Sequence, residues 1–162
     1  MSIESYYAKR AYEYEAVYAK PERQADLAAL RGLVPGYFKG CKVLEVACGT
    51  GYWTQVVAAQ AASVWAADVN QSMLDIARSK HFARRNVEFV IDDAYTLNAC
   101  PGGFSAALAA FWWSHLPRQR TAEFLQALHD KLLPGARVMI LDNRYVAGSS
   151  TPIRFMRWRR SV

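Results

Sequence analysis

The chain has 162 residues, 52% of them hydrophobic and 21% charged, which is the composition of a globular protein of about one domain. No apolar run reaches the roughly 18 residues that a membrane span needs, and the first residues do not resemble a secretory signal. The cysteines form neither an even disulfide set nor a CxxC metal pair, so we expect a cytoplasmic protein without a metal site. They are Cys41, Cys48 and Cys100.

The formal net charge of +6 is concentrated at the C-terminus, where four arginines lie in the last nine residues. We therefore expect one domain over residues 1–150, with a helical N-terminal segment over residues 1–40, and a basic tail over residues 151–162. A solvated tail explains the charge more simply than a nucleic-acid groove does, although Trp158 among the arginines leaves contact with bases or lipid open.

The N-terminal segment predicts helices. Residues 5–17 are helix-compatible and rich in tyrosine. A second helix is expected from Pro21, because proline suits a first turn and three leucines follow at intervals of about one turn. These are Leu27, Leu30 and Leu33. The breaker-rich stretch VPGYFKG is expected to end this helix.

Five short apolar runs follow, with helix-like segments between them. Asn70 is a predicted N-cap for the helix after the second run, and Pro134 with Gly135 is expected to stop the helix before the fifth. The apolar face of that last helix is Phe124, Leu125, Leu128 and Leu132. Apolar strands alternating with helices predict a doubly wound α/β fold around a parallel sheet. The runs are CKVLEV, SVWAAD, VEFVID, FSAALAAF and ARVMILD.

The turn after the first run is rich in glycine, and ligands of such sheets bind beyond the carboxyl ends of the strands. Gly49 and Gly51 let the backbone pass close to a bound group, and the helix behind them presents free N–H groups. A nicotinamide fingerprint would read GxGxxG, whereas here Ala47 holds the first position and Glu45 precedes the turn. This carboxylate would repel a pyrophosphate and attract an ammonium or a sulfonium.

Two further strand ends carry acids. Asp68 ends the second run, where a ribose-binding acid belongs in this architecture. Asp92 and Asp93 end the third, where a carboxylate can accept from an adenine amino group. Each acid alone could be an N-cap or turn residue, and that explanation is strong for Asp92 and for Asp142. Together they favour an adenosine site.

The segment VLEVACGTGYWT resembles the glycine-rich motif of class I S-adenosylmethionine-dependent methyltransferases of the small-molecule type, and the similarity runs from about Tyr14 to Asp142. The family motif is commonly E/D-x-G-x-G-x-G, from which Ala47 departs. The resemblance implies a Rossmann-like, mostly parallel sheet of about five strands in the order 3-2-1-4-5. Because few residues follow Asp142, we expect the chain to lack all or part of the family's strand 6/7 hairpin, or to replace one of its strands with IRFMRWRR.

The resemblance also implies S-adenosylmethionine as the cofactor. Glu45 would organise the loop around its ammonium group and Asp68 would hold the ribose. Met73 or Val69 would pack on the adenine, whose edge Asp93 would contact. The full set expected around the cofactor is Glu45, Ala47, Gly49, Thr50, Gly51, Trp53, Asp68, Val69, Met73, Asp93, Ala94, Tyr95 and Phe111.

The segment AAFWWSHLP resembles the family's fourth-strand exit, where Trp112 and Trp113 would form the substrate side. Such an apolar wall favours a small-molecule acceptor over a flipped base. His115 is the candidate general base for a hydroxyl or amine acceptor, although a capping role explains it equally well. Tyr14 and Tyr18 would contact the methyl region if the N-terminal helix closes over the cofactor, whereas plain packing is the simpler explanation.

Two alternatives to an active methyltransferase stay open. One is a catalytically weak or inactive S-adenosylmethionine-binding protein or partner subunit, which the short C-terminus supports. The other is a nicotinamide-dependent oxidoreductase, which Glu45 and the missing third glycine disfavour. An exposed edge at the fifth strand would promote association, so pairing with a second copy along that edge is expected.

Overall fold

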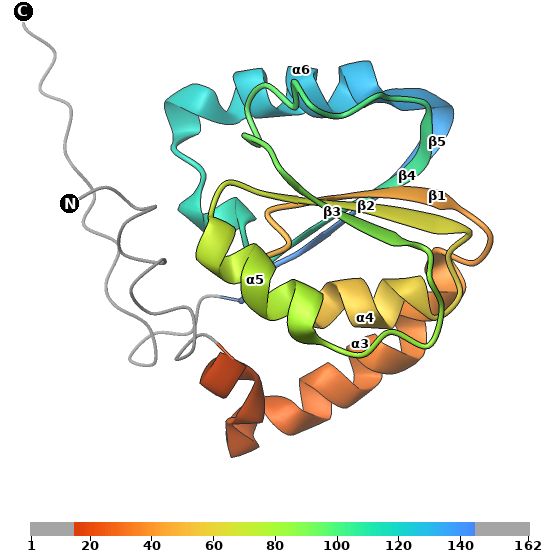
Figure 1. The fold of residues 1–162 in the computed structure, drawn as a ribbon. Helices are drawn as coiled ribbons and strands as arrows, with labels where there is room; N and C mark the ends of the chain where they lie inside the picture. The colour runs from red at the N-terminus through yellow and green to blue at the C-terminus, as the bar shows by residue number, and fades with distance from the viewer. Residues whose placement is uncertain (1–14, 145–162) are drawn as a thin grey trace, which may run out of the picture.

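The computed structural model describes residues 15–144, which form three layers, with a sheet between two layers of helices (Figure 1). No helix in this part of the chain is long and apolar enough to cross a membrane. The helices are α3 (Gln24–Tyr37), α4 (Tyr52–Ala58), α5 (Gln71–Ser79) and α6 (Thr121–Lys131), with short 3-10 turns η1 (Val17–Ala19), η2 (Pro21–Arg23), η3 (Trp113–His115) and η4 (Arg118–Arg120). The strands are β1 (Lys42–Val46), β2 (Ser63–Asp68), β3 (Val87–Ile91), β4 (Phe104–Ala110) and β5 (Leu132–Leu141).

The sheet confirms the predicted topology. Its five strands within the described residues are all parallel and lie in the order β3-β2-β1-β4-β5. The register pairs Val46 of β1 with Ala67 of β2 and with Ala109 of β4. The turns that follow these strands therefore meet at one end of the sheet, which is where the sequence places a ligand site.

The two faces of the sheet carry separate cores because successive strand residues point to opposite sides. In Figure 1, α3, α4 and α5 cover one face and α6 covers the other. Val43, Val64 and Leu108 belong to the core of the α3–α5 face, whereas Leu44 and Phe104 belong to the core of the α6 face. The strands are thus apolar on both faces, as a doubly wound fold requires.

Helix α3 is longer than predicted. It begins at Gln24, after Pro21 has opened the 3-10 turn η2, and it runs through Pro35 to Tyr37. Val34 and Phe38 are both fully buried, so packing against the core outweighs the breaker signal of VPGYFKG. Leu33 was wrongly placed in the apolar stripe, since it is 60% exposed.

The boundary between α6 and β5 also differs from the prediction. The helix ends at Lys131, and Pro134 and Gly135 lie inside β5 instead of stopping the helix. The pairing with β4 shifts register there, which leaves the proline outside the regular ladder, as a sheet requires. Leu125 is 43% exposed and does not belong to the buried face of α6.

The remaining expectations concern the Asn70 cap and the two terminal segments. Asn70 holds the N-cap position of α5, but its side chain makes no capping hydrogen bond. The helical segment predicted over residues 5–17 lies mostly outside the described residues. The same holds for the basic tail over residues 151–162.

Candidate functional site

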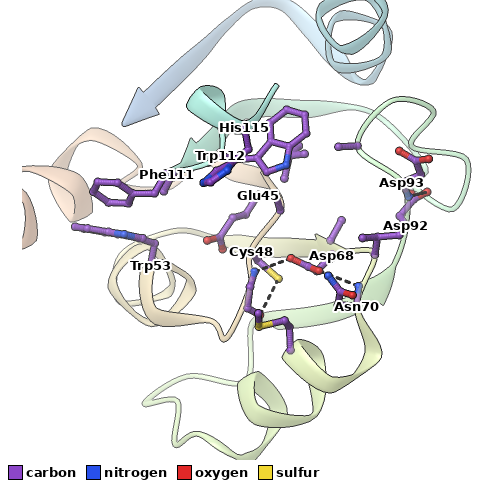
Figure 2. Close-up of a pocket in the computed structure, with 18 of the residues that line it drawn as sticks. Glu45, Cys48, Trp53, Asp68, Asn70, Asp92, Asp93, Phe111, Trp112 and His115 are labelled. Atoms are coloured by element: carbon purple, nitrogen blue, oxygen red, sulfur yellow. Dashed lines mark hydrogen bonds between the residues drawn. The ribbon is translucent and has the colours of Figure 1, made fainter. Parts of the chain in front are cut away.

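A cavity of about 310 Å³ opens at the carboxyl ends of β1, β2, β3 and β4 (Figure 2). Fifteen of the eighteen predicted site residues line it: Tyr18, Glu45, Ala47, Gly49, Thr50, Trp53, Asp68, Val69, Met73, Asp93, Ala94, Tyr95, Phe111, Trp112 and His115. Gly51 and Trp113 do not line it. Tyr14 lies outside the described residues. The structure therefore brings nearly the whole predicted set to one place.

The two glycines of the first turn have different tasks. Both are left-handed, with φ of 55° at Gly49 and 78° at Gly51. A Cβ atom on Gly49 would meet nothing within 4 Å, so this residue leaves the cavity open. A Cβ atom on Gly51 would lie 2.9 Å from the Cβ of Ala77, so Gly51 allows α4 to approach α5. Gly51 thus has a packing role, and its expected contact with a cofactor stays a prediction.

Ala47 occupies the position where the family motif has its first glycine, and it is left-handed with φ of 54°. Such a conformation costs an alanine roughly 1 kcal/mol or more. The loop therefore keeps the conformation that the motif specifies even with a methyl group at that position.

Asp68 fastens this loop to the end of β2. Its Oδ2 accepts the backbone N–H of Gly49 at 2.8 Å, and its Oδ1 accepts the N–H of Asn70 at 2.9 Å (Figure 2). Burial raises the pKa of this carboxyl, and the two backbone donors oppose that shift. Each carboxylate oxygen keeps a further lone pair, so the arrangement is compatible with accepting ligand hydroxyls.

Glu45 is the most unusual polar residue of the site. Its side chain is 1% exposed, and its Oε2 has no hydrogen-bond partner among the described residues. Burial raises its pKa to about 8, helped by the charge of Asp68 and opposed by the nearby Thr54 hydroxyl. An isolated buried carboxyl is costly in free energy, and a cation entering the cavity would remove much of that cost.

The two acids after β3 differ in burial and in their hydrogen-bond partners. Asp92 is buried, and its oxygens accept the backbone N–H groups of Asp93 and Ala99 at 2.9 and 3.0 Å. This confirms the turn explanation for Asp92. Asp93 is exposed beside the cavity, where its Oδ1 accepts the N–H of Tyr95 at 2.8 Å.

The β4 exit supplies an aromatic wall. Trp112 lies against Phe124, with ring centroids 4.7 Å apart, and against Tyr95 at 5.7 Å. Trp113 is 37% exposed and does not line the cavity, whereas Trp112 does, and the substrate-side role expected of both stays a prediction. His115 reaches the cavity from η3.

Asp142, at the end of β5, holds η3 in place. Its Oδ2 accepts the backbone N–H of Ser114 at 2.6 Å, and its Oδ1 accepts the Ser114 hydroxyl at 3.1 Å. This confirms a turn role for Asp142. The acid thereby fixes the turn that carries His115.

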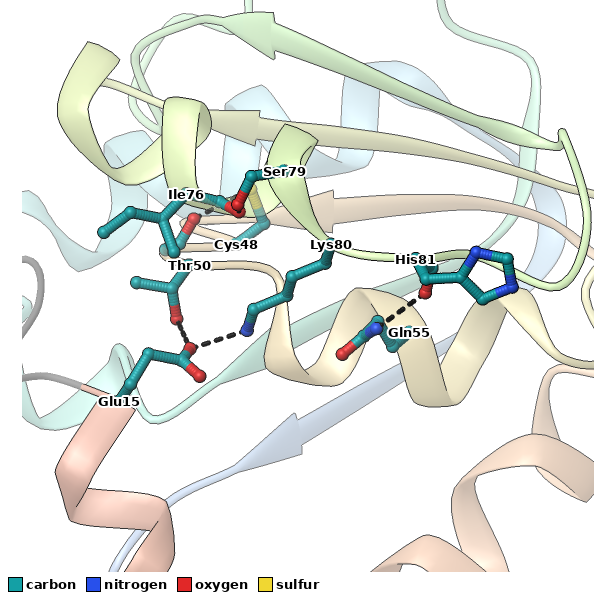
Figure 3. Close-up of polar contacts among 9 residues, drawn as sticks. Glu15, Cys48, Thr50, Gln55, Ile76, Ser79, Lys80 and His81 are labelled. Carbon is teal, nitrogen blue, oxygen red and sulfur yellow. Dashed lines mark hydrogen bonds and ion pairs between the residues drawn. The ribbon is translucent and has the colours of Figure 1, made fainter.

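The start of the described chain covers the glycine loop. Glu15 accepts hydrogen bonds from the Thr50 hydroxyl and from Lys80 Nζ, the latter at 2.6 Å (Figure 3). The ring of Tyr18 stacks on Tyr52, with centroids 3.9 Å apart, and meets Phe111 edge-on at 6.4 Å. The segment before α3 is thus part of the cavity wall.

Arg120 was missed by the sequence analysis. It lines the cavity with its guanidinium 3.3 Å from the ring centroid of Tyr95, and it makes two 2.7 Å hydrogen bonds to Glu123. An arginine just before a helix carries no sequence signal for such a contact. No group of His, Cys, Asp and Glu residues in the described part of the chain has the arrangement of a metal site.

We predict that Glu45→Gln makes the protein more stable at about pH 8 and flattens the dependence of stability on pH. Since burial raises the pKa from 4.5 to about 8, the folded chain holds a proton that the unfolded chain releases between these values. Stability should therefore fall as pH rises through this window, by up to ~1.4 kcal/mol per pH unit, and Gln cannot titrate.

Urea denaturation across this window measures the effect. Part of the slope should persist in the variant, because the pKa of Asp68 is raised in the same direction. Glu88→Gln, at an exposed carboxyl of β3, is the matched control and should leave the slope unchanged. Equal slopes in the wild type and Glu45→Gln would contradict the prediction.

The comparisons with known proteins agree with this geometry. Demethylmenaquinone methyltransferase of Staphylococcus epidermidis is 30% identical over 107 residues, which are 64% of this chain and 44% of the relative. This chain thus spans less than half the length of that curated relative. The structure of a DhpI–SAH complex is similar with a TM-score of 0.74 and 34% identity, over 86% of this chain and 66% of the other.

A DhpI–SAM–HEP complex gives a TM-score of 0.73 and 33% identity, over 88% of this chain and 67% of the other. The family model described as "Methyltransferase domain" matches residues 43–135, more than half of the 162 residues. The matched range includes the glycine loop, Asp68 and Asp93. This chain belongs to the methyltransferase domain family.

Proposed function

We propose that this chain is the cofactor-binding domain of an S-adenosylmethionine-dependent methyltransferase that acts on a small-molecule acceptor. The observation that carries the proposal is the buried carboxyl of Glu45, whose Oε2 has no partner among the described residues, in the cavity wall beside the open loop at Gly49. The positive charge of an adenosyl ligand such as S-adenosylmethionine would pair with this carboxyl in its ionised form. Family membership and the likeness to SAH and SAM complexes of DhpI support the same cofactor.

The cavity residues fit this cofactor in chemistry and order. Glu45 would hold the ammonium group, and the second lone pairs of Asp68 would accept ribose hydroxyls. Met73, buried at the start of α5, and Val69 would pack on the adenine, beside Asp93. In Figure 2, Glu45, Asp68 and Asp93 follow one another across the cavity, as these groups do along the ligand.

S-adenosylmethionine supplies a methyl group that its sulfonium already activates, so the protein needs mainly to position the acceptor and exclude water. The rings of Phe111 and Trp112 form an apolar wall that suits both tasks. An apolar wall around a cavity of this size favours a small-molecule acceptor.

The two alternatives make different predictions. A nicotinamide dinucleotide would bring a pyrophosphate toward the loop that follows Glu45, where a protonated Glu45 offers no positive charge and an ionised carboxylate at Glu45 or Asp68 would repel it. A binding protein without activity would retain the cofactor site, so ligand binding alone does not distinguish it from an enzyme. Turnover does.

We expect calorimetry to detect binding of S-adenosylmethionine and S-adenosylhomocysteine, and none of NAD. Asp68→Asn should weaken both adenosyl ligands at least ~10-fold, since it removes the charge that accepts the ribose hydroxyls. Asp130→Asn, in an exposed position on α6, is the matched control. Binding of NAD without either adenosyl ligand would overturn the proposal.

The same titrations report on Glu45. With a pKa of about 8 this carboxyl is mostly protonated at neutral pH, and an ammonium group would displace its proton. Binding should therefore release protons, so that the observed enthalpy changes with the ionisation enthalpy of the buffer. This dependence should be lost in Glu45→Gln.

We propose His115 as the general base for a hydroxyl or amine acceptor. In a screen of small-molecule acceptors with labelled S-adenosylmethionine, His115→Gln should lower turnover by about 10²-fold and leave S-adenosylhomocysteine affinity unchanged. His129→Gln, on the exposed side of α6, is the control. Unchanged turnover in His115→Gln would leave the residue with a structural role only.

We propose that two copies pair along the edge of β5 that faces away from β4. This strand pairs only with β4 within the described sheet, and Val138 and Ile140 on it are 42% and 40% exposed. Sedimentation should give twice the chain mass, and Val138→Lys should shift the protein toward the monomer. A monomer at every concentration would contradict this pairing.

A further inference from the structure

The indole N–H of Trp53 is a second unpartnered polar group of the cavity wall. Trp53 is 2% exposed, lines the cavity, and its Nε1 has no hydrogen-bond partner among the described residues. A buried donor without a partner costs roughly 1–3 kcal/mol. Its aromatic body packs well, with Phe111 at 6.0 Å and Tyr52 at 5.2 Å between ring centroids. Packing thus accounts for the ring and not for the N–H group.

The position of this donor relative to Glu45 indicates which ligand group it could bind. Glu45 lies just before the glycine loop and Trp53 just after it. In Figure 2 Glu45 lies between Trp53 and Asp68, and the indole lies beneath the ring of Phe111. The wall therefore offers an unpartnered acceptor and, beyond it, an unpartnered donor. An α-amino acid group carries the complementary pair, an ammonium and a carboxylate.

Two neighbouring side chains supply no donor here, because the Thr50 hydroxyl donates to Glu15 and Phe111 has no polar group. A ligand carboxylate beside Glu45 would meet repulsion unless a donor compensated it, and a hydrogen bond to a charged acceptor is stronger than one between neutral groups. We propose that the Trp53 indole N–H binds the α-carboxylate of the cofactor's amino acid end and so selects ligands that carry this group.

This inference rests on the proposed function, because it assumes an adenosyl cofactor in the cavity. Both unpartnered atoms are shielded from water in this structure. Contact between the carboxylate and the indole N–H therefore requires a local shift of side chains that pack on Trp53, such as Phe111.

The test compares two ligands that differ only in the carboxylate, S-adenosylhomocysteine and its decarboxylated analogue. Trp53→Phe keeps an aromatic, though smaller, ring and removes the donor. We expect it to weaken S-adenosylhomocysteine about 10-fold, which is ~1.4 kcal/mol, and the decarboxylated analogue less than about two-fold. Trp65→Phe is the matched control, because the Trp65 N–H is also buried without a partner but lies away from this cavity. It should change neither affinity.

Equal losses for both ligands in Trp53→Phe would show that the indole acts by packing, and no loss for either would show that it does not contact the ligand. Both outcomes overturn the inference and leave the proposed function standing. Failure of the wild type to bind S-adenosylhomocysteine would overturn the proposed function itself.

Magnetic resonance of nitrogen-labelled tryptophan in the wild type gives a second measurement that does not depend on the folding of a variant. One indole N–H signal should shift downfield with S-adenosylhomocysteine and stay in place with the decarboxylated analogue. If no indole signal distinguishes the two ligands, the inference fails.

Discussion

The carboxylate of Asp68 is the contact on which the site depends. By accepting the N–H groups of Gly49 and Asn70, it joins the loop after β1 to the turn after β2. The parallel register brings these two strand ends level, and Asp68 then fixes the distance between the loops that follow. Because the contact uses backbone donors, it sets the shape of the cavity floor whichever side chains surround it.

The cavity wall contains two polar groups that have no hydrogen-bond partner among the described residues of the folded chain. Glu45 and Trp53 are each buried with an unpartnered polar atom, while nearby Asp92 has both oxygens satisfied by backbone donors. Each unpartnered group lowers the stability of the free protein. Their retention in the cavity wall is the pattern expected where stability is sacrificed for binding, because a ligand with the complementary charges recovers the lost free energy on entry.

The sequence predicted the features that local residue patterns determine, and it did not predict those that tertiary packing determines. The strands and the glycine loop depend on apolar runs and backbone conformation, which short stretches of sequence record, and the order of the five strands was confirmed. The end of α3 at Tyr37 could not be predicted, because the burial of Val34 and Phe38 decides it against a local breaker signal. Leu33 and Leu125 were misplaced for a related reason: helical spacing identifies a stripe, but not which of its borders faces solvent.

The same distinction runs through the site. Glu45, Asp68 and Asp93 lie at strand ends, so topology alone brings them together. Trp112 and Trp113 are adjacent in the sequence and both rings meet Phe124 on α6, yet Trp112 lines the cavity and Trp113 does not. Arg120 reaches the cavity through Tyr95 and Glu123, contacts for which its own position in the sequence gives no sign. The strand-end acids of the cavity were therefore predictable from the sequence, whereas Arg120 and the different positions of the two tryptophans were not.

The segment before α3 forms one side of the cavity wall and is held there by individual contacts. The Glu15–Lys80 pair has side chains that are 35% and 15% exposed, and a partly exposed pair of this kind contributes up to ~1 kcal/mol. The stack of Tyr18 on Tyr52 adds about 1 kcal/mol beyond the area that it buries. Helix α3, in contrast, is anchored by the buried Leu27 and Val34. Glu15 also accepts the Thr50 hydroxyl, and Tyr18 meets the ring of Phe111, so polar and aromatic contacts together hold the segment before α3 against the wall that contains Glu45 and Trp53.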